Sequence, residues 1–365
     1  MIFCNKCFAD SEVRFIIEGI GKRSDHCETC GQRDVFLYDT EINFELTDMF
    51  EELVNIYTPA HLLPETFPKG NLKMLKDELV ENWHIFHPHL SRAKVYDIIK
   101  NICMEDYTAN SELFDAPIGI SERYDEVALS EHSLLKNYSW DEFVSSLKHH
   151  NRFHSQHMNL DLFEKFCSFI RKGYKKGAIF YRARIAPETG YPVEQMGAPS
   201  EEFAVPGRAN SAGIRCFYLT SGESTAIHEV RAGVFDYVTV AKFELQEDIV
   251  VIDLKAIDRI SPFISEFDYL EHALNKDHLH RINAEMGKAL RRSDSVLDYL
   301  PTQYISDFIK SIQYGDKPEY AGIEYNSTID SDGVNFALFE PFPMLKCIEI
   351  NTYRISEIQY RKDKV

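Results

Sequence analysis

The sequence has no segment typical of export or of membrane insertion. Its first ten residues, MIFCNKCFAD, lack the basic and then apolar pattern of a signal peptide. No stretch approaches the roughly 20 apolar residues that a membrane-spanning helix requires. We therefore expect a soluble, cytoplasmic protein without a membrane partner.

Basic residues are scarce relative to acidic ones. The 365 residues include 40 Lys and Arg against 58 Asp and Glu, which gives a formal net charge of −18. Because a nucleic acid-binding surface needs an excess of basic side chains to pair with phosphates, this balance argues against general nucleic acid binding. A local basic pocket remains compatible with it.

Two common nucleotide-binding motifs are also missing. No GxGxxG follows a predicted strand, and no GxxxxGK[ST] is present, so the sequence predicts neither a Rossmann site nor a P-loop. From about residue 175, short strands such as AIFYRARI and YVTVAKFEL mix with helical segments such as ESTAIHEVRA, without a regular β-α-β order. This mixture favours an α+β fold with a largely antiparallel sheet.

The cysteines that are present fall into two groups. Cys4, Cys7, Cys27 and Cys30 form two CxxC pairs, whereas Cys103, Cys167, Cys216 and Cys347 are isolated and are predicted to be free thiols. Two CxxC turns can complete a tetrahedral zinc site, and four thiolates leave no open position for catalysis. We predict that residues 1–40 form a zinc ribbon around a structural zinc ion. Disulfides or redox chemistry are the alternatives.

Three segments of the C-terminal half concentrate polar residues within apolar patterns. They are FYRARIAPETG, PGRANSAGIRCFYLTSGESTAIHEVRAG and TQYISDFIKSIQYGDKPEYAGIEYNSTIDSDGVNFALF. Together, and in this order, they resemble the RES domain, the toxin half of RES–Xre toxin–antitoxin systems. The three residues that give the family its name match Arg182, Glu229 and Ser327. The resemblance covers roughly residues 175–345, and we assign residues 173–365 to a RES domain.

The resemblance implies a fold, an activity and a set of site residues. The fold is an ADP-ribosyltransferase-like mixed sheet, and the activity is degradation of NAD⁺, in some members by phosphorolysis. Arg182, Tyr218, Glu229 and Ser327 are the implied catalytic residues. Among the residues implied to bind NAD⁺, Arg182 and Arg208 hold its phosphates, Tyr218 stacks on nicotinamide and Ser327 hydrogen-bonds ribose.

The residue types suit this chemistry. The segment RKGYKKGAIFYRAR contains six basic residues and no acidic one, as an anion-binding patch would. Arg182 and Arg184 alternate with other residues on one predicted strand, so both should point the same way. Cleavage of the nicotinamide–ribose bond builds positive charge on the ribose, and a carboxylate such as Glu229 can stabilise it. Nicotinamide leaves as a neutral ring, so no general acid is needed.

Each of these residues also has an ordinary structural interpretation. Arg208 could be a surface turn residue, Tyr218 a half-buried strand end, Glu229 a carboxylate paired with Arg231 or a lysine, and Ser327 a turn residue. Arg215 and Arg231 are predicted to be surface or pairing residues. The expected partners are NAD⁺, phosphate, an antitoxin or regulatory protein, and further copies of the chain in a homo-oligomer. The acceptor is open between water, phosphate and a protein side chain.

Residues 41–172 show helical periodicity. LSRAKVYDIIKNIC and SWDEFVSSLKHH each begin with a candidate N-cap, Ser91 and Ser139. This zone loosely resembles the HEPN-type helical domains that are fused to RES domains. Arg152 and His157, with four residues between them, fit the short HEPN ribonuclease pattern, which gives an alternative function involving RNA. A third hypothesis is a non-enzymatic adaptor that binds through the zinc ribbon.

Overall fold

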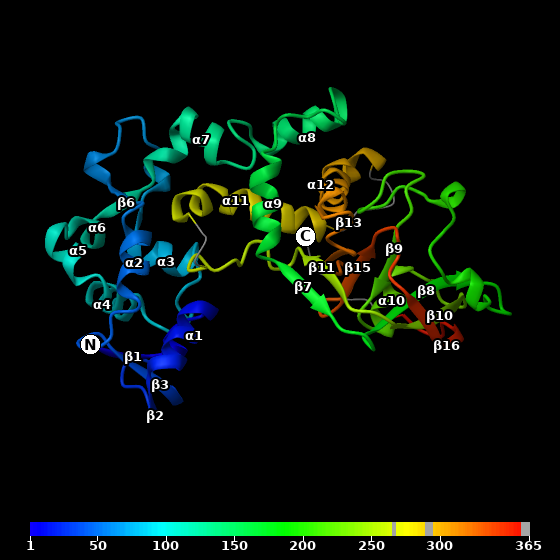
Figure 1. Ribbon diagram of the computed structural model, residues 1–365, viewed down its shortest axis with the longest axis horizontal. Coiled ribbons are helices and arrows are strands. Elements are labelled where there is room, and N and C mark those ends of the chain that lie inside the picture. The colour runs from blue at the N-terminus through cyan, green and yellow to red at the C-terminus, as the bar shows by residue number, and fades with distance from the viewer. Residues whose placement is uncertain (265–267, 289–294, 359–365) are drawn as a thin grey trace. The chain divides into compact units, whose positions relative to one another are not determined.

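The computed structural model describes residues 1–264, 268–288 and 295–358 (Figure 1). They divide into two compact units, Met1–Asn137 with Arg259–Lys276, and Tyr138–Asp258 with Asp277–Val365. The predicted division into 1–40, 41–172 and 173–365 stays a prediction, because compactness alone does not show which segments fold independently. None of the described helices is both long and apolar enough to span a membrane.

The first unit begins with a small antiparallel sheet and one helix. The strands are β1 (Ile2–Cys4), β2 (Lys22–His26) and β3 (Arg33–Asp39), in the order β1-β3-β2, and the helix is α1 (Ser11–Ile20). The Asp10 carboxylate caps α1 by accepting the backbone N–H groups of Glu12 and Val13. This cap starts the helix in a position that buries Val13 and Ile17.

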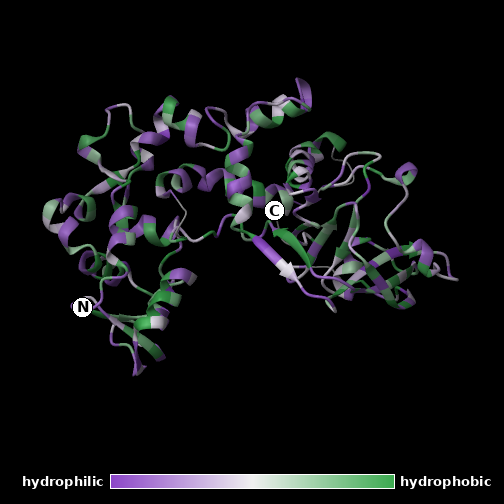
Figure 2. Cartoon of the chain, in the orientation of Figure 1, coloured by the Kyte–Doolittle hydropathy of each residue, from purple (hydrophilic) through white to green (hydrophobic). Residues whose placement is uncertain are grey.

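The rest of the first unit is mainly helical. Its helices are α2 (Thr47–Val54), α3 (Leu75–Glu81), α4 (Arg92–Ile102), α5 (Met104–Ala109), α6 (Glu112–Asp115), α7 (Glu126–His132) and the beginning of α11 (Tyr269–Met286), and a second small sheet has the order β4 (Thr58–Pro59), β6 (Pro117–Gly119), β5 (Lys73–Met74). The Ser91 hydroxyl accepts the backbone N–H of Lys94, which confirms the predicted N-cap of α4. In Figure 2, hydrophobic and hydrophilic residues alternate around these helices, as expected for helices with one buried face.

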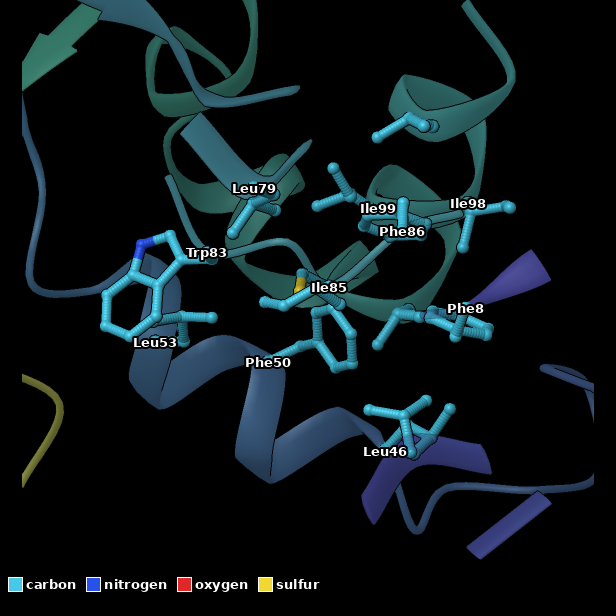
Figure 3. Close-up of a cluster of buried hydrophobic side chains, with 14 of the residues drawn as sticks. Phe8, Leu46, Phe50, Leu53, Leu79, Trp83, Ile85, Phe86, Ile98 and Ile99 are labelled. Atoms are coloured by element: carbon cyan, nitrogen blue, oxygen red, sulfur yellow. The ribbon is translucent and has the colours of Figure 1, made fainter. Parts of the chain in front are cut away.

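One continuous hydrophobic core fills the first unit (Figure 3). Phe8 lies 4.9 Å from Phe86 and 6.3 Å from Phe50, measured between ring centroids. Leu46, Leu53, Leu79, Ile98 and Ile99 complete the packing around these rings. The N-terminal sheet and the helices that follow therefore share their buried side chains.

The second unit is built on an eight-stranded sheet. In spatial order the strands are β16 (Leu345–Arg354), β10 (Tyr237–Leu245), β8 (Ile179–Ala186), β9 (Phe217–Thr220), β15 (Val334–Leu338), β14 (Gly322–Asn326), β11 (Ile249–Asp253) and β7 (Arg171–Tyr174). Only β11 and β14 pair in parallel among these strands, and the other neighbours are antiparallel. The predicted α+β class with a large mixed sheet in the C-terminal region is therefore confirmed.

Alternation along the strands gives the sheet two different faces. Phe180, Phe217, Phe243 and Phe336 lie in one hydrophobic cluster. On the other face, α10 (Glu223–Glu229) packs its Ala226 into a smaller cluster with Ala183, Val238 and Val240. The remaining helices and strands of this unit are α8 (Trp140–His149), α9 (Leu160–Ser168), α12 (Leu300–Ser311), β12 (Gln313–Tyr314) and β13 (Lys317–Pro318). Ser139 and Glu142 form a capping box that begins α8, which confirms the second predicted N-cap.

Short 3₁₀ helices connect the regular elements. They are η1 (Asn5–Cys7), η2 (Ala60–Leu62), η3 (Lys69–Asn71), η4 (Ser121–Tyr124), η5 (Val193–Gln195), η6 (Glu201–Phe203) and η7 (Val296–Tyr299). η5 and η6 lie in the long connection between β8 and β9, which also contains the glycine-flanked turn at Gly207.

Candidate functional site

A row of polar and aromatic side chains crosses four adjacent strands of the large sheet. Tyr181 on β8 pairs with Thr220 on β9, Thr220 with Asn335 on β15, and Asn335 with Tyr325 on β14. Because paired residues on neighbouring strands point to the same face, these four side chains lie side by side. All four line a cavity of about 520 Å³. The row therefore forms one wall of a site large enough for a small-molecule ligand.

The cavity lies where the sheet is least continuous. Within the described residues, β8 and β9 pair at a single position, Tyr181 with Thr220. Ala183 follows Tyr181 by two residues and Tyr218 precedes Thr220 by two residues, and both line the cavity. Ala226 and Glu229 on α10 line it as well. The cavity is thus bounded by separating strands and by the helix that follows β9.

Glu229, the last residue of α10, is held through one of its two oxygens. Its Oε1 accepts hydrogen bonds from the Ser327 hydroxyl at 2.6 Å and from Nδ2 of Asn335 at 2.8 Å. Among the described residues, no hydrogen bond or ion pair engages the other oxygen, Oε2. The carboxylate is fixed in place and keeps one oxygen for a ligand.

Ser327 is itself fixed by a tight turn after β14. Its Oγ accepts the backbone N–H groups of Ile329 at 3.2 Å and Asp330 at 3.1 Å. The Asp330 carboxylate accepts the Thr225 hydroxyl at 2.6 Å, which ties the turn to α10. A Cβ at Gly333 would lie 2.5 Å from Cγ2 of Thr225, so the close approach of turn and helix requires glycine.

Tyr218 contributes its ring to the cavity and its hydroxyl to a neighbouring turn. The hydroxyl donates to Oδ1 of Asn210 at 2.7 Å and accepts the backbone N–H of Ala209 at 3.0 Å. Burial raises the pKa of Tyr218 well above its ordinary value, so the phenol stays neutral. A Cβ at Gly207 would lie 2.6 Å from this hydroxyl, which explains the glycine. The turn that contains Arg208 is thereby fixed against β9.

Arg208 lines the cavity and is anchored at the C-terminal end of α11. Its guanidinium donates to the carbonyl of Glu285 at 2.7 Å and also to that of Lys288. A cation is favourable there because the carbonyls at a helix C-terminus carry partial negative charge. The same guanidinium lies 5.9 Å from the centroid of the Tyr325 ring. A fixed positive charge therefore borders the cavity.

Arg182 also lines the cavity, but its guanidinium has a partner within the protein. Nη1 donates to the carbonyl of Gly197 at 2.7 Å, and the guanidinium lies 5.2 Å from the Phe217 ring. Arg184 donates to the carbonyl of Gln195 in the same connection, so the two arginines do point the same way. Burial, with repulsion from Arg184, lowers the pKa of Arg182 to about 10, which still leaves it charged at neutral pH.

The structure thus brings the predicted residues of the C-terminal region together. Arg182, Arg208, Tyr218 and Glu229 line one cavity, and Ser327 contacts Glu229. The roles assigned to them stay predictions. The sequence motifs predict that these residues lie close together.

Residues 179–357 match the RES domain family. The match runs from the first residue of β8 to beyond β16, and it includes every residue that lines the cavity. No curated protein sequence and no solved structure shows significant similarity to the chain.

Several residues of the cavity wall were not expected from the sequence. Asn335, Tyr325 and Thr220 were not predicted. Arg231 is exposed, as predicted for a surface residue, and it also lines the cavity. Arg215 does pair, with the Glu340 carboxylate at 2.6 Å. The one available signal for Asn335 was an amide in the middle of the apolar strand VNFALF.

The four N-terminal cysteines lie outside the RES match and form a separate cluster. Their sulfur atoms all lie within 4.8 Å of one another, with Cys4 Sγ 3.8 Å from Cys7 Sγ and 3.5 Å from Cys30 Sγ. Tetrahedral zinc at about 2.3 Å from each sulfur requires sulfurs roughly 3.8 Å apart. All eight cysteines of the chain are free thiols, so no disulfide competes. Cys4, Cys7, Cys27 and Cys30 therefore fit a structural zinc ion.

Arg152 and His157 lie in an irregular segment between α8 and α9, also outside the RES match. Arg152 lines a second cavity, of about 260 Å³, together with Phe153 and Asp307. His157 is not among the described residues that line it, and its ring lies 4.0 Å from that of Tyr138. The structure does not bring the two residues into one site, and the ribonuclease alternative stays a prediction without a supporting observation.

Proposed function

We propose that the RES region cleaves the bond between nicotinamide and ribose in NAD⁺. The observation that carries the proposal is the state of Glu229, whose Oε1 is held by Ser327 and Asn335 while Oε2 remains for a ligand. Positive charge develops on the ribose as this bond breaks, and a fixed carboxylate stabilises it without having to reorganise. The match to the RES family supports the same activity.

The rest of the cavity suits a dinucleotide with two negative phosphates. Arg182, Arg208 and Arg231 line it with Glu229, so cations outnumber carboxylates among the described lining residues. Guanidinium groups suit phosphate oxygens because they donate two parallel hydrogen bonds. The rings of Tyr181, Tyr218 and Tyr325 offer flat apolar surfaces for the nicotinamide and adenine bases.

The proposed reaction exchanges one bond at the anomeric carbon. The bond to the nicotinamide nitrogen breaks, and its electron pair leaves with nicotinamide, which becomes neutral. An oxygen of the acceptor forms the new bond. Water or a side-chain hydroxyl then releases its proton to the solvent, whereas an ionised phosphate oxygen has no proton to lose. Water as acceptor gives ADP-ribose, phosphate gives ADP-ribose-1″-phosphate, and a protein side chain gives an ADP-ribosylated protein.

Identification of the product tests the proposal and selects the acceptor. Purified protein is incubated with NAD⁺, with and without phosphate, and the products are separated and identified by mass spectrometry. We expect free nicotinamide together with one of the three ADP-ribose products. Intact NAD⁺ in both reactions, and an unchanged NAD⁺ level in cells that express the protein, would contradict the proposal. The cellular measurement covers the case in which the purified enzyme is autoinhibited.

A further inference from the structure

Asn335 is a buried polar residue in the middle of the strand that forms the cavity wall. It is 7% exposed and lies between the buried Phe336 and the half-buried Val334 on β15. An amide in such a place is costly unless its hydrogen bonds are made. The wall residues Thr220 and Tyr325 flank it on the neighbouring strands and point to the same face.

Only half of this amide is satisfied within the protein. Nδ2 donates to Oε1 of Glu229, but Oδ1 is buried and has no hydrogen-bond partner in the part of the chain that the structure describes. A side-chain carbonyl oxygen has two lone pairs and can only accept. Because native proteins rarely leave such an atom without a partner, its position in the wall of the cavity indicates a ligand that donates to it.

Ser327 cannot supply the contact to ribose that was predicted for it without breaking bonds that it already makes. Its single proton goes to Glu229, and its oxygen accepts from both Ile329 and Asp330. A hydroxyl offers one donor and two lone pairs, so its capacity is used. Ser327 is in this respect a positioning residue. Of the described groups around Glu229, two acceptors remain, Oε2 of Glu229 and Oδ1 of Asn335.

We propose that Asn335 Oδ1 and Glu229 Oε2 together accept hydrogen bonds from the two adjacent hydroxyls of the ribose that carries nicotinamide. This inference rests on the proposed function. These two oxygens can only accept hydrogen bonds, so a ligand that fits them must offer two neighbouring donors. The 2′- and 3′-hydroxyls of a ribose are such a pair. The contact holds the sugar so that its anomeric carbon lies beside the carboxylate. It makes Asn335 a substrate-binding residue as well as a support for Glu229.

The test pairs Asn335 variants with two NAD⁺ analogues that lack either the 2′- or the 3′-hydroxyl of the nicotinamide ribose. We expect the wild type to lose at least tenfold in kcat/KM with each analogue. Asn335→Ala should lower kcat/KM for NAD⁺ by a similar factor. With the analogue that lacks the hydroxyl bound by Asn335, the same substitution should lower kcat/KM little further, because that contact is already absent. Asn335→Asp keeps an acceptor oxygen and should keep the discrimination between NAD⁺ and that analogue, even where its kcat falls.

Asn326→Ala is the matched control, because Asn326 lies at the exposed end of β14. It should behave as the wild type with all three substrates. Thermal unfolding checks the fold of each variant, and Asn335→Ser serves the same comparison if Asn335→Ala does not fold. If Asn335→Ala lowers kcat/KM by the same factor for NAD⁺ and for both analogues, the inference is overturned, while the proposal of NAD⁺ cleavage is unaffected.

A protein that binds NAD⁺ without cleaving it would separate the two proposals. The same comparison is then made on dissociation constants measured by calorimetry. Coupling between Asn335→Ala and one analogue would uphold the ribose contact although cleavage is refuted. A wild type that neither binds nor cleaves NAD⁺ would overturn both.

Discussion

The Ser327 hydroxyl lies 2.6 Å from Oε1 of Glu229, although 98 positions separate the two residues in the sequence. The turn after β14 sets this contact, because Ser327 also accepts two backbone N–H groups and cannot rotate freely. The two residues that the sequence motifs matched to the Glu and the Ser of the RES family name are therefore joined in one hydrogen-bonded unit. This relationship determines how the carboxylate faces the cavity.

Replacement of Ser327 tests whether it acts through Glu229. We expect Ser327→Ala to lower kcat for NAD⁺ cleavage about 10- to 100-fold, since a hydrogen bond to a charged group contributes roughly 1.5–3 kcal/mol. KM should change little, because the hydroxyl has no capacity left for substrate. Ser327→Thr keeps the hydroxyl and should recover part of the rate. Ser331→Ala, at an exposed position of the same turn, is the control, and a rise in KM at constant kcat would contradict this role.

Arg182 and Arg184 form a matched pair on β8. Both guanidinium groups donate to carbonyls of the connection that contains Gln195 and Gly197, but only Arg182 lines the cavity. If Arg182 also binds phosphate, Arg182→Gln should raise KM for NAD⁺ about tenfold or more, which corresponds to about 1.4 kcal/mol. Arg184→Gln should leave KM within about twofold. Equal effects in both variants would show that the arginines serve only to hold the connection.

The cysteine cluster predicts one zinc ion per chain. Metal analysis of the purified protein should find it, and Cys27→Ser should remove most of it and lower the melting temperature, because a metal that binds only the folded state stabilises that state. Cys347→Ser is the control, since Cys347 lies far along the sequence on β16. Its zinc content should equal that of the wild type. Full zinc content in Cys27→Ser would contradict the assignment.

Glu324 predicts a pH-dependent stability. It is fully buried on β14, and although burial alone would raise its pKa, hydrogen bonds from Lys172, Lys255 and Tyr174 outweigh burial and hold the pKa below its usual value. A lowered pKa in the folded state contributes stability that is present above the unfolded pKa of about 4.3 and is lost as the pH falls through the folded value.

We therefore expect Glu324→Gln to reduce the free energy of unfolding at pH 7 by on the order of 3 kcal/mol, because two lysines lose a buried partner. The difference from wild type should shrink below about pH 4. Denaturant unfolding at several pH values measures both. Glu349→Gln removes an exposed partner of Lys242 and should cost at most about 1 kcal/mol at any pH. A pH-independent loss in Glu324→Gln would refute the ionic explanation.

The sequence predicted the α+β class because the hydrophobic period changes near residue 175, and short strands then alternate irregularly with helices. It did not predict the order of the strands. β10 pairs with β16, more than a hundred positions away, and such pairings depend on the register of whole strands rather than on any local pattern.

The site was predictable where a charged residue stands in a distinctive motif, as Glu229 does in AIHEV. Asn335 was not predicted, because its contact with Glu229 forms only in the folded chain. Arg231 is exposed as predicted, but no local pattern indicated that it also lines the cavity from its position after α10, where its φ is 50°. The backbone carbonyls that accept hydrogen bonds from Arg182 and Arg208 could not be predicted from the sequence either.

The most direct test of the account is nicotinamide release from NAD⁺ by the wild type and by Glu229→Gln. The amide preserves the shape of the side chain but cannot balance the positive charge that forms on the ribose. His228→Ala, an exposed position on the same helix, controls for damage to α10. We expect the wild type and His228→Ala to release nicotinamide at similar rates, and Glu229→Gln to be slower by about 100-fold or more. Full activity in Glu229→Gln would contradict the account.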